Sequence, residues 1–108
     1  MLTYKNKNYV CHLDLGMDLI RGKWKAVILC HLESGPKRFL ELQRITSGIS
    51  QKVLNEKLAQ LESAGLIFKT TYPEVPPRVE FELTPMGKEL SPALDILEKW
   101  SVKHFSDL

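Results

Sequence analysis

Apolar residues at helical spacing occupy most of the first half of the chain, and glycine and proline divide them into segments. The pattern predicts a first helix over about residues 10–20, a second helix from Trp24 to the Gly35-Pro36 pair, and a short third helix over 38–44. Small polar residues at 46–48 then indicate a turn. The apolar positions behind these predictions are Val10, Leu13, Met17, Ile20, Val27, Ile28, Leu32, Phe39 and Leu42.

The clearest predicted helix lies between Ser50 and Gly65. A serine hydroxyl suits the N-cap, and a glycine suits the left-handed residue that follows a helix. Three leucines form one apolar stripe along this segment, namely Leu54, Leu58 and Leu61. Polar residues occupy the opposite face near the N-terminus, namely Gln51, Lys52, Asn55 and Glu56. One face is therefore expected to be buried, and the other is free to contact a partner.

After Gly65 the apolar period changes from helical to two, which predicts two antiparallel strands. In the first strand Leu66, Phe68 and Tyr72 alternate with polar residues, and in the second Val79, Phe81 and Leu83 do so. Three prolines stiffen the connection over 73–77, so the hairpin should have a projecting tip.

A final helix is predicted from Pro85 to about residue 104. Thr84 suits its N-cap, and proline is favoured at the first helical position. Pro92 lies inside this helix and predicts a kink. The apolar stripe Leu90, Leu94 and Leu97 continues toward Trp100 and Phe105. Because a small core does not need all of this stripe, a second copy of the chain is expected to cover part of it.

Length and composition indicate a small single-domain protein. With 108 residues, 44% of them apolar, the chain suits one domain over residues 1–108, with terminal helices at about 10–20 and 85–104 available for dimerisation. No apolar run is long enough to span a membrane, and the start does not resemble a signal peptide, so a cytoplasmic protein is expected. The two cysteines lack zinc-binding spacing, and neither a metal nor a cofactor is expected.

Positive charge is concentrated in the middle of the sequence. The net charge is only +2, but residues 21–57 contain eight basic and three acidic residues, an excess of +5. A basic surface is the usual electrostatic feature of nucleic-acid binding. Glutamine and asparagine pair with adenine, lysine suits guanine or phosphate, and serine suits either, so the polar face of the Ser50–Gly65 helix matches DNA recognition.

The order of elements is that of a winged helix-turn-helix, an α+β fold that is mainly α. Three helices, a polar-faced helix and a two-stranded hairpin follow one another. In this fold one helix enters the major groove and the hairpin forms a wing along the DNA backbone.

A series of short motifs, in order over residues 11–100, carries a family resemblance. They are Cys11, Leu19-Ile20-Arg21-Gly22-Lys23-Trp24, Gly35-Pro36-Lys37-Arg38-Phe39 with Leu42, Gly48-Ile49-Ser50-Gln51-Lys52-Val53-Leu54, Leu61-Glu62 with Gly65-Leu66-Ile67, Tyr72-Pro73-Glu74-Val75-Pro76-Pro77-Arg78-Val79-Glu80-Phe81, Leu83-Thr84-Pro85 with Gly87, and Trp100. Together they make the chain similar to the HxlR-type winged helix-turn-helix transcriptional regulators of bacteria.

The resemblance implies a homodimer that binds double-stranded DNA at a pseudo-palindromic operator and does not act at a membrane. It also implies that the terminal helices hold the dimer and that the predicted fourth helix and the wing face DNA. The candidate DNA-binding residues are Lys37, Arg38, Ser50, Gln51, Lys52, Asn55 and Arg78.

Two other classes of function compete with DNA binding. An enzyme is disfavoured because the Cys11-His12 and Cys30-His31 pairs are adjacent on helices, where neighbouring side chains diverge by about 100°. A winged-helix module that binds protein without specific DNA binding remains the alternative.

The two cysteines differ in expected role. Cys11 lies close in sequence to Lys5, Lys7 and His12, which makes it the candidate redox-sensing residue, because some branches of the similar family sense oxidants or electrophiles there. A plain structural role for Cys11 stays open. Cys30 lies among apolar helix positions and is expected to be a reduced core residue.

Overall fold

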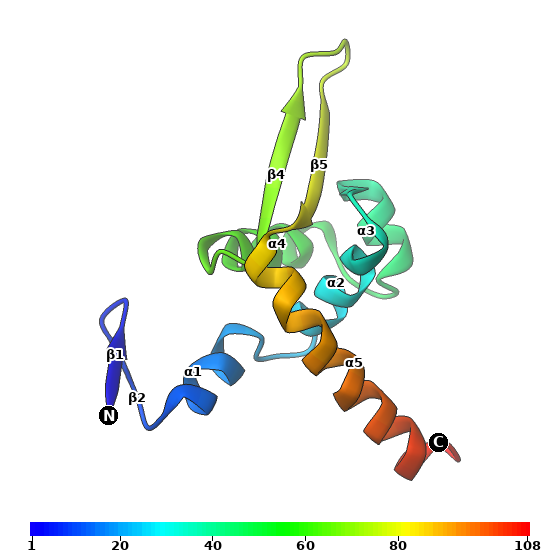
Figure 1. The fold of residues 1–108 in the computed structure, drawn as a ribbon. Helices are drawn as coiled ribbons and strands as arrows, with labels where there is room; N and C mark the ends of the chain where they lie inside the picture. Colours follow the sequence, from blue (N-terminus) through cyan, green and yellow to red (C-terminus); the bar gives the residue numbers. More distant parts are fainter.

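The helices of this computed structural model, which describes residues 1–108, lie close to the predicted segments (Figure 1). The first predicted helix is shorter than expected, since Val10 lies outside it and Cys11 is its N-cap. The second predicted helix ends in a turn of 3-10 helix before Gly35. The helical elements are α1 (His12–Leu19), α2 (Lys25–His31), η1 (Leu32–Ser34), α3 (Phe39–Ile45), α4 (Gln51–Ser63) and α5 (Pro85–Phe105).

Both ends of α4 carry the predicted caps. The Ser50 hydroxyl oxygen accepts a hydrogen bond from the backbone N–H of Val53 at 3.1 Å. At the other end Gly65 adopts a φ of +77°, which lets the N–H of Leu66 donate to the carbonyl of Leu61 at 3.0 Å. These two caps determine where the helix begins and where the chain turns toward the wing.

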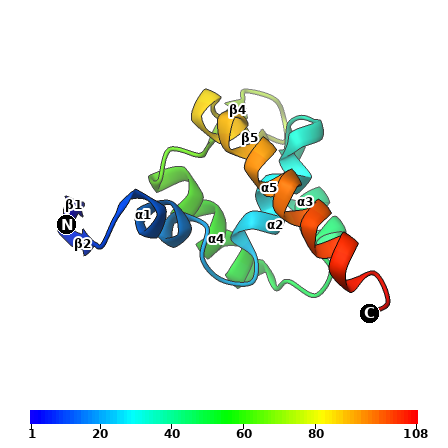
Figure 2. The same cartoon turned by 60° about the horizontal axis from the view of Figure 1, so that its bottom comes forward.

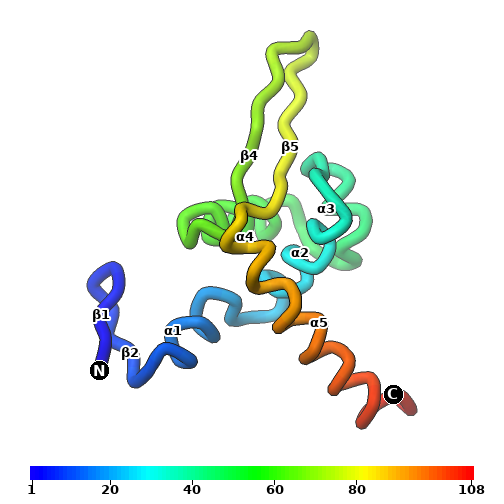
Figure 3. The backbone as a smooth tube through the Cα atoms, in the orientation of Figure 1, coloured from blue at the N-terminus to red at the C-terminus, as the bar shows by residue number.

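The wing is a three-stranded antiparallel sheet in the order β3-β5-β4. Its strands are β3 (Lys37–Arg38), β4 (Ile67–Tyr72) and β5 (Arg78–Leu83). The first of these was not predicted, because two residues are too few to show an alternating pattern. Beyond the sheet, the proline-containing connection forms the tip of a hairpin that projects well away from the helices (Figures 1 and 3).

The alternation of Leu66, Phe68 and Tyr72 with polar residues predicts that Phe68 faces the core, and this prediction is wrong. Phe68 is 38% exposed, whereas Ile67 is buried and pairs in register with Leu83. Leu66, the residue before the strand, is also buried. The chain leaves α4 through a tight turn at Gly65, and this turn directs two successive residues into the core before the alternation begins.

A second hairpin, absent from the predictions, precedes α1. Its strands are β1 (Leu2–Tyr4) and β2 (Lys7–Tyr9), and the turn between them places Lys5 and Asn6 at positive φ. The strands are three residues each and largely polar, so only Tyr9 is buried. This hairpin and the C-terminal end of α5 extend from opposite ends of the molecule (Figure 2).

The core lies where α2, α4 and the base of the wing meet. Thirteen buried residues form it, namely Ile28, Leu29, Leu32, Leu42, Ile49, Leu54, Leu58, Leu61, Leu66, Ile67, Phe81, Leu83 and Leu94. Helix α5 begins against this core at Gly87, where an added Cβ would collide with the backbone of Leu66. The N-cap at Thr84, predicted from the sequence, accepts from the N–H of Gly87 at 3.0 Å. The architecture is the expected winged helix-turn-helix.

Helix α5 runs as one element through Pro92. Beyond Leu94 its apolar side chains face solvent, as do several of α1. The exposed large apolar residues are Leu13 and Met17 in α1 and, beyond Leu94 in α5, Ile96, Leu97, Trp100, Val102 and Phe105. No helix of the structure combines the length and the apolar character needed to cross a bilayer.

Candidate nucleic-acid interface

Helix α4 presents the polar face expected from the sequence. Its leucine stripe is buried, with Leu54 and Leu61 at zero exposure. On the opposite side Gln51, Lys52 and Asn55 are all exposed. None of these three side chains makes a hydrogen bond or ion pair within the chain, so their polar groups are available. Ser50 is also exposed, although its oxygen is engaged as the N-cap.

The two candidate residues before α3 differ in availability. Both belong to β3, where Lys37 pairs with Phe81 and Arg38 with Glu80 of the wing. The Lys37 ammonium donates to the Ser34 hydroxyl at 2.8 Å and is directed back toward η1. Arg38 is exposed and forms no ion pair. The tertiary structure therefore places Arg38 in the edge strand β3 of the wing as a cation without an ion-pair partner.

Arg78 at the base of the wing tip is held by neighbours that the sequence did not indicate. Its Nε lies 2.9 Å from the Glu74 carboxylate, without the alignment of a true hydrogen bond, and its Nη1 lies 3.5 Å from Glu80. Its guanidinium carbon stands 4.0 Å from the centre of the Tyr72 ring. The positive charge of Arg78 is thus partly balanced within the wing.

Cys11 is exposed and forms the N-cap of α1. The basic side chains expected near it are engaged elsewhere. The Lys7 ammonium binds the Asp18 carboxylate at 3.1 Å, and the Lys5 ammonium donates to the Ser63 carbonyl at 2.7 Å. The structure therefore supports the accessibility of Cys11 and gives no evidence that lysines activate it.

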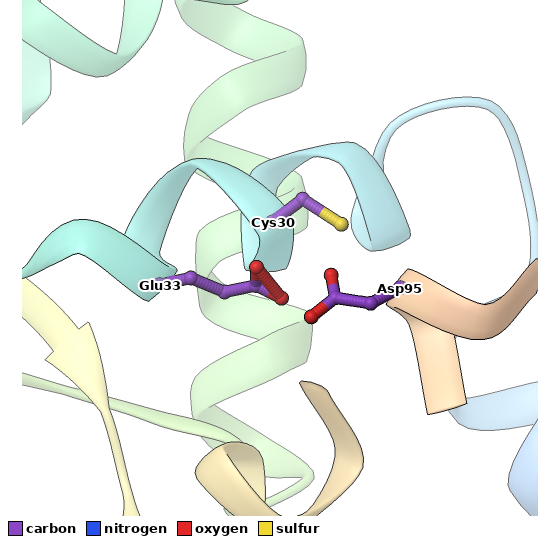
Figure 4. A group of neighbouring side chains, drawn as sticks. All are labelled: Cys30, Glu33 and Asp95. Carbon is purple, nitrogen blue, oxygen red and sulfur yellow. The ribbon is translucent and has the colours of Figure 1, made fainter. Parts of the chain in front are cut away.

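Cys30 is not enclosed by apolar side chains alone. It packs against the core from one side, and on the other side it meets Glu33 of η1 and Asp95 of α5 (Figure 4). One potential ligand atom from each of the three residues lies within 4.8 Å of the others. Asp95 is 65 positions from Cys30, so no local spacing in the sequence could reveal this group.

This three-residue cluster carries more negative charge than its surroundings favour. Burial, followed by a hydrogen bond with the Asp95 carboxyl, raises the pKa of Glu33. Burial and then the charge of Glu33 raise the pKa of the Cys30 thiol, which keeps the thiol neutral. A sulfur and two carboxylates are donors that a borderline cation accepts. A proton shared between the two carboxyl groups satisfies the same geometry, and a neutral thiol is a poor metal ligand.

Comparison with known proteins agrees with this architecture. A family model described as HxlR-like helix-turn-helix matches residues 19–107. The uncharacterized HTH-type transcriptional regulator YtcD of Bacillus subtilis (strain 168) is 42% identical over 102 residues, which cover 94% of this chain and 81% of that protein.

Two solved structures are similar throughout. The redox regulator HypR in its reduced form has a TM-score of 0.83 and 35% identity, covering 86% of this chain and 92% of that chain. The reduced form of the transcriptional regulator YodB from B. subtilis has a TM-score of 0.80 and 29% identity. This match covers 93% of this chain and 99% of that chain.

The raised pKa of Glu33 has a consequence for stability. Because folding favours the protonated carboxyl, the stabilisation is complete below the pKa of the unfolded state, about 4.3, and is lost as pH rises through the folded pKa. Glu33→Gln, which imitates the protonated form, is expected to raise Tm slightly at pH 7, because the side chain is exposed to solvent, and to have less effect at pH 4. Thermal unfolding followed by circular dichroism at both pH values measures this difference.

Glu62→Gln removes the same charge from an exposed position of α4 and serves as the control. If both variants shift Tm equally at pH 7, general charge rather than the carboxyl pair is responsible.

Proposed function

Because the chain belongs to the HxlR-like helix-turn-helix family of transcriptional regulators, we propose that it binds a specific sequence of double-stranded DNA as a homodimer. The observation that carries this proposal is the division of α4 into a fully buried leucine stripe and a free polar face. A helix held in this way presents its side chains without having to rearrange when it binds.

The dimensions and chemistry of α4 support insertion into the major groove. Its 13 residues span about 20 Å at about 1.5 Å per residue, and the groove is about 12 Å wide. Gln51 and Asn55 offer paired donors and acceptors for adenine, and Lys52 offers a cation for guanine or phosphate. Ser50 adds a hydroxyl, Arg38 of β3 adds a free cation for backbone phosphates, and Lys37 adds one where a phosphate replaces its hydrogen bond to Ser34.

The exposed apolar residues of α1 and α5 support the homodimer. Trp100 is 55% exposed and contacts the ring of Phe105 edge-on, with centroids 6.0 Å apart. Large apolar side chains exposed in such numbers are typical of an interface. A twofold partner covering the terminal helices, about 10–20 and 85–104, would set two copies of α4 about 34 Å apart, one turn of DNA, on a pseudo-palindromic operator.

Substitutions on α4 test this assignment directly. Gln51→Ala or Lys52→Ala should weaken binding to the DNA upstream of the gene that encodes this protein by about 1–3 kcal/mol. Folding and the mass of the dimer should not change. The side chains lie outside the leucine stripe, so stability should not respond. Fluorescence anisotropy with excess random competitor DNA measures the affinity, and sedimentation measures the mass.

Glu62→Ala, near the end of the same helix, is the matched control and should bind like the wild-type protein. Wild-type affinity in both Gln51→Ala and Lys52→Ala would reject α4 as the recognition helix. The absence of any specific complex, even at low salt, would favour the protein-binding alternative.

We assign Arg78 a phosphate contact that competes with the wing carboxylates. Its partner Glu74 lies on the solvent-facing tip, so the guanidinium can exchange this carboxylate for a phosphate without leaving the Tyr72 ring. The contacts with Glu74 and the Tyr72 ring restrict the arginine side chain in the free protein, which reduces the entropy lost on binding.

If Arg78 exchanges Glu74 for a phosphate, substitutions of Arg78 and of Glu74 should change DNA affinity in opposite directions. Arg78→Ala should weaken DNA binding and reduce the slope of log affinity against log salt by about one phosphate, roughly 0.9. Glu74→Gln should strengthen binding, because the phosphate no longer displaces a carboxylate. Affinity measured across a salt series distinguishes them, and unchanged slopes in both variants would leave Arg78 a structural residue of the strand.

Cys11 is the residue we propose as the redox-sensing position. It is the more exposed of the two cysteines, whereas Cys30 is partly buried and its thiol pKa is raised. Oxidation requires a thiol that solvent can reach. Cys11 also begins α1, whose exposed Leu13 and Met17 belong to the proposed dimer surface, so its oxidation would act on the spacing of the two recognition helices.

Cysteine substitutions separate the two sites. Diamide should change the DNA affinity of the wild-type protein and of Cys30→Ser, and it should leave Cys11→Ser unaffected. Non-reducing gels show whether the oxidised product is a disulfide between subunits. A response that persists in Cys11→Ser, or no response in the wild-type protein, contradicts this role and leaves Cys11 a structural residue.

A further inference from the structure

Two adjoining surface pockets, both open to solvent, lie between the N-terminal hairpin, α1, the start of α2 and the second half of α4. Their volumes are about 400 Å³ and about 410 Å³. They share four lining residues, namely Lys7, Asp18, Lys25 and Gln60. This shared wall makes them two halves of one site, which we call the hairpin site. Volumes of this size are typical of small-molecule sites.

The half nearer α2 is strongly cationic. Four basic side chains line it, namely Lys7, Arg21, Lys25 and Lys57, against the single carboxylate of Asp18. No hydrophobic residue lines this half. Its charge is therefore +3 within a cavity of seven lining residues.

Asp18 cannot balance this charge because it is already fully engaged. Its oxygens accept from the Lys7 ammonium at 3.1 Å and the Tyr9 hydroxyl at 2.7 Å, and they pair with Arg21 at 2.8 Å. Hydrogen bonds from Tyr9 and Lys7 hold the pKa of the Asp18 carboxyl below its usual range, so it is ionised.

Lys25 and Lys57 have no ion-pair partner. Burial, followed by the charge of Lys57, lowers the pKa of the Lys25 ammonium, as expected where two neighbouring cations face each other. An anion placed between them would relieve this repulsion.

The other half is mainly apolar. Tyr4, Tyr9 and Leu19 line one side, and Ala59 and Ala64 of α4 line the other. The Tyr9 ring is buried, so it forms a fixed wall. A DNA phosphate would satisfy the lysines but would leave this half empty, whereas a ring attached to an anion fills both halves.

We propose that the hairpin site binds a small aromatic carboxylic acid, with its carboxylate between Lys25 and Lys57 and its ring against Tyr4 and Tyr9. Such a ligand would join the hairpin and α1 to α4, where the Lys5 ammonium already donates to the Ser63 carbonyl at 2.7 Å. Its consequence for gene regulation rests on the proposed DNA binding, whereas the binding itself does not.

Binding can be tested on the full chain without DNA, so that the result is independent of the proposed regulator function. In two-dimensional NMR titrations, 2-naphthoate should cause saturable shifts at amides of Lys7, Asp18, Lys25 and Gln60. The neutral isostere 2-naphthamide should bind about tenfold more weakly, because it lacks the charge, and acetate should also be weaker, because it lacks the ring.

The double variant Lys25→Gln with Lys57→Gln should lose at least about tenfold in affinity for 2-naphthoate. Lys69→Gln, an exposed lysine of β4 outside the site, is the matched control and should bind normally. Equal affinity for the acid and the amide, shifts confined to other residues, or an unaffected double variant would overturn the proposal. So would a double variant that loses DNA affinity while retaining 2-naphthoate binding, since the lysines would then serve DNA phosphates.

Discussion

The burial of the leucine stripe of α4 is the constraint on which the rest of the molecule depends. Leu54, Leu58 and Leu61 are each at most 2% exposed and pack with the apolar residues of α2 and the base of the wing. Truncating one such leucine costs about 2–5 kcal/mol in a typical core, a large part of the stability of a small domain. Since this face cannot turn outward, the polar face must, and the direction of the wing follows from the cap at Gly65.

Electrostatics in this chain depends less on the number of cations than on which of them have partners. Lys7 and Arg21 share Asp18, and Arg78 is held by Glu74 and Glu80. Arg38, Lys25 and Lys57 have none. The first group is partly neutralised within the chain, whereas the second is available to an external anion. Part of the basic excess of residues 21–57 therefore lies at the hairpin site, and part lies on β3 and the polar face of α4.

The two cysteines illustrate how surroundings separate chemically identical side chains. Cys11 begins a helix on the surface, where an oxidant can reach it. Cys30 is partly buried beside two carboxyl groups, and burial, followed by the charge of Glu33, raises its thiol pKa and keeps it a weak nucleophile. The carboxyl groups of Glu33 and Asp95 meet at the surface between η1 and α5, so the protonation of Glu33 is connected with the contact between these two elements.

The sequence by itself determined the elements whose signals are local. Helix α4 with Ser50 and Gly65, helix α5 from Thr84, and the two long strands of the wing all follow from periodicity and capping, which act within a few residues. The polar face of α4 follows for the same reason. Only the tertiary structure decided the pairing of β3 with β5, the burial of Ile67 in place of Phe68, the carboxylates around Arg78, and the approach of Asp95 to Cys30. These contacts join distant positions, and no periodic pattern records which side chains meet when separate elements pack.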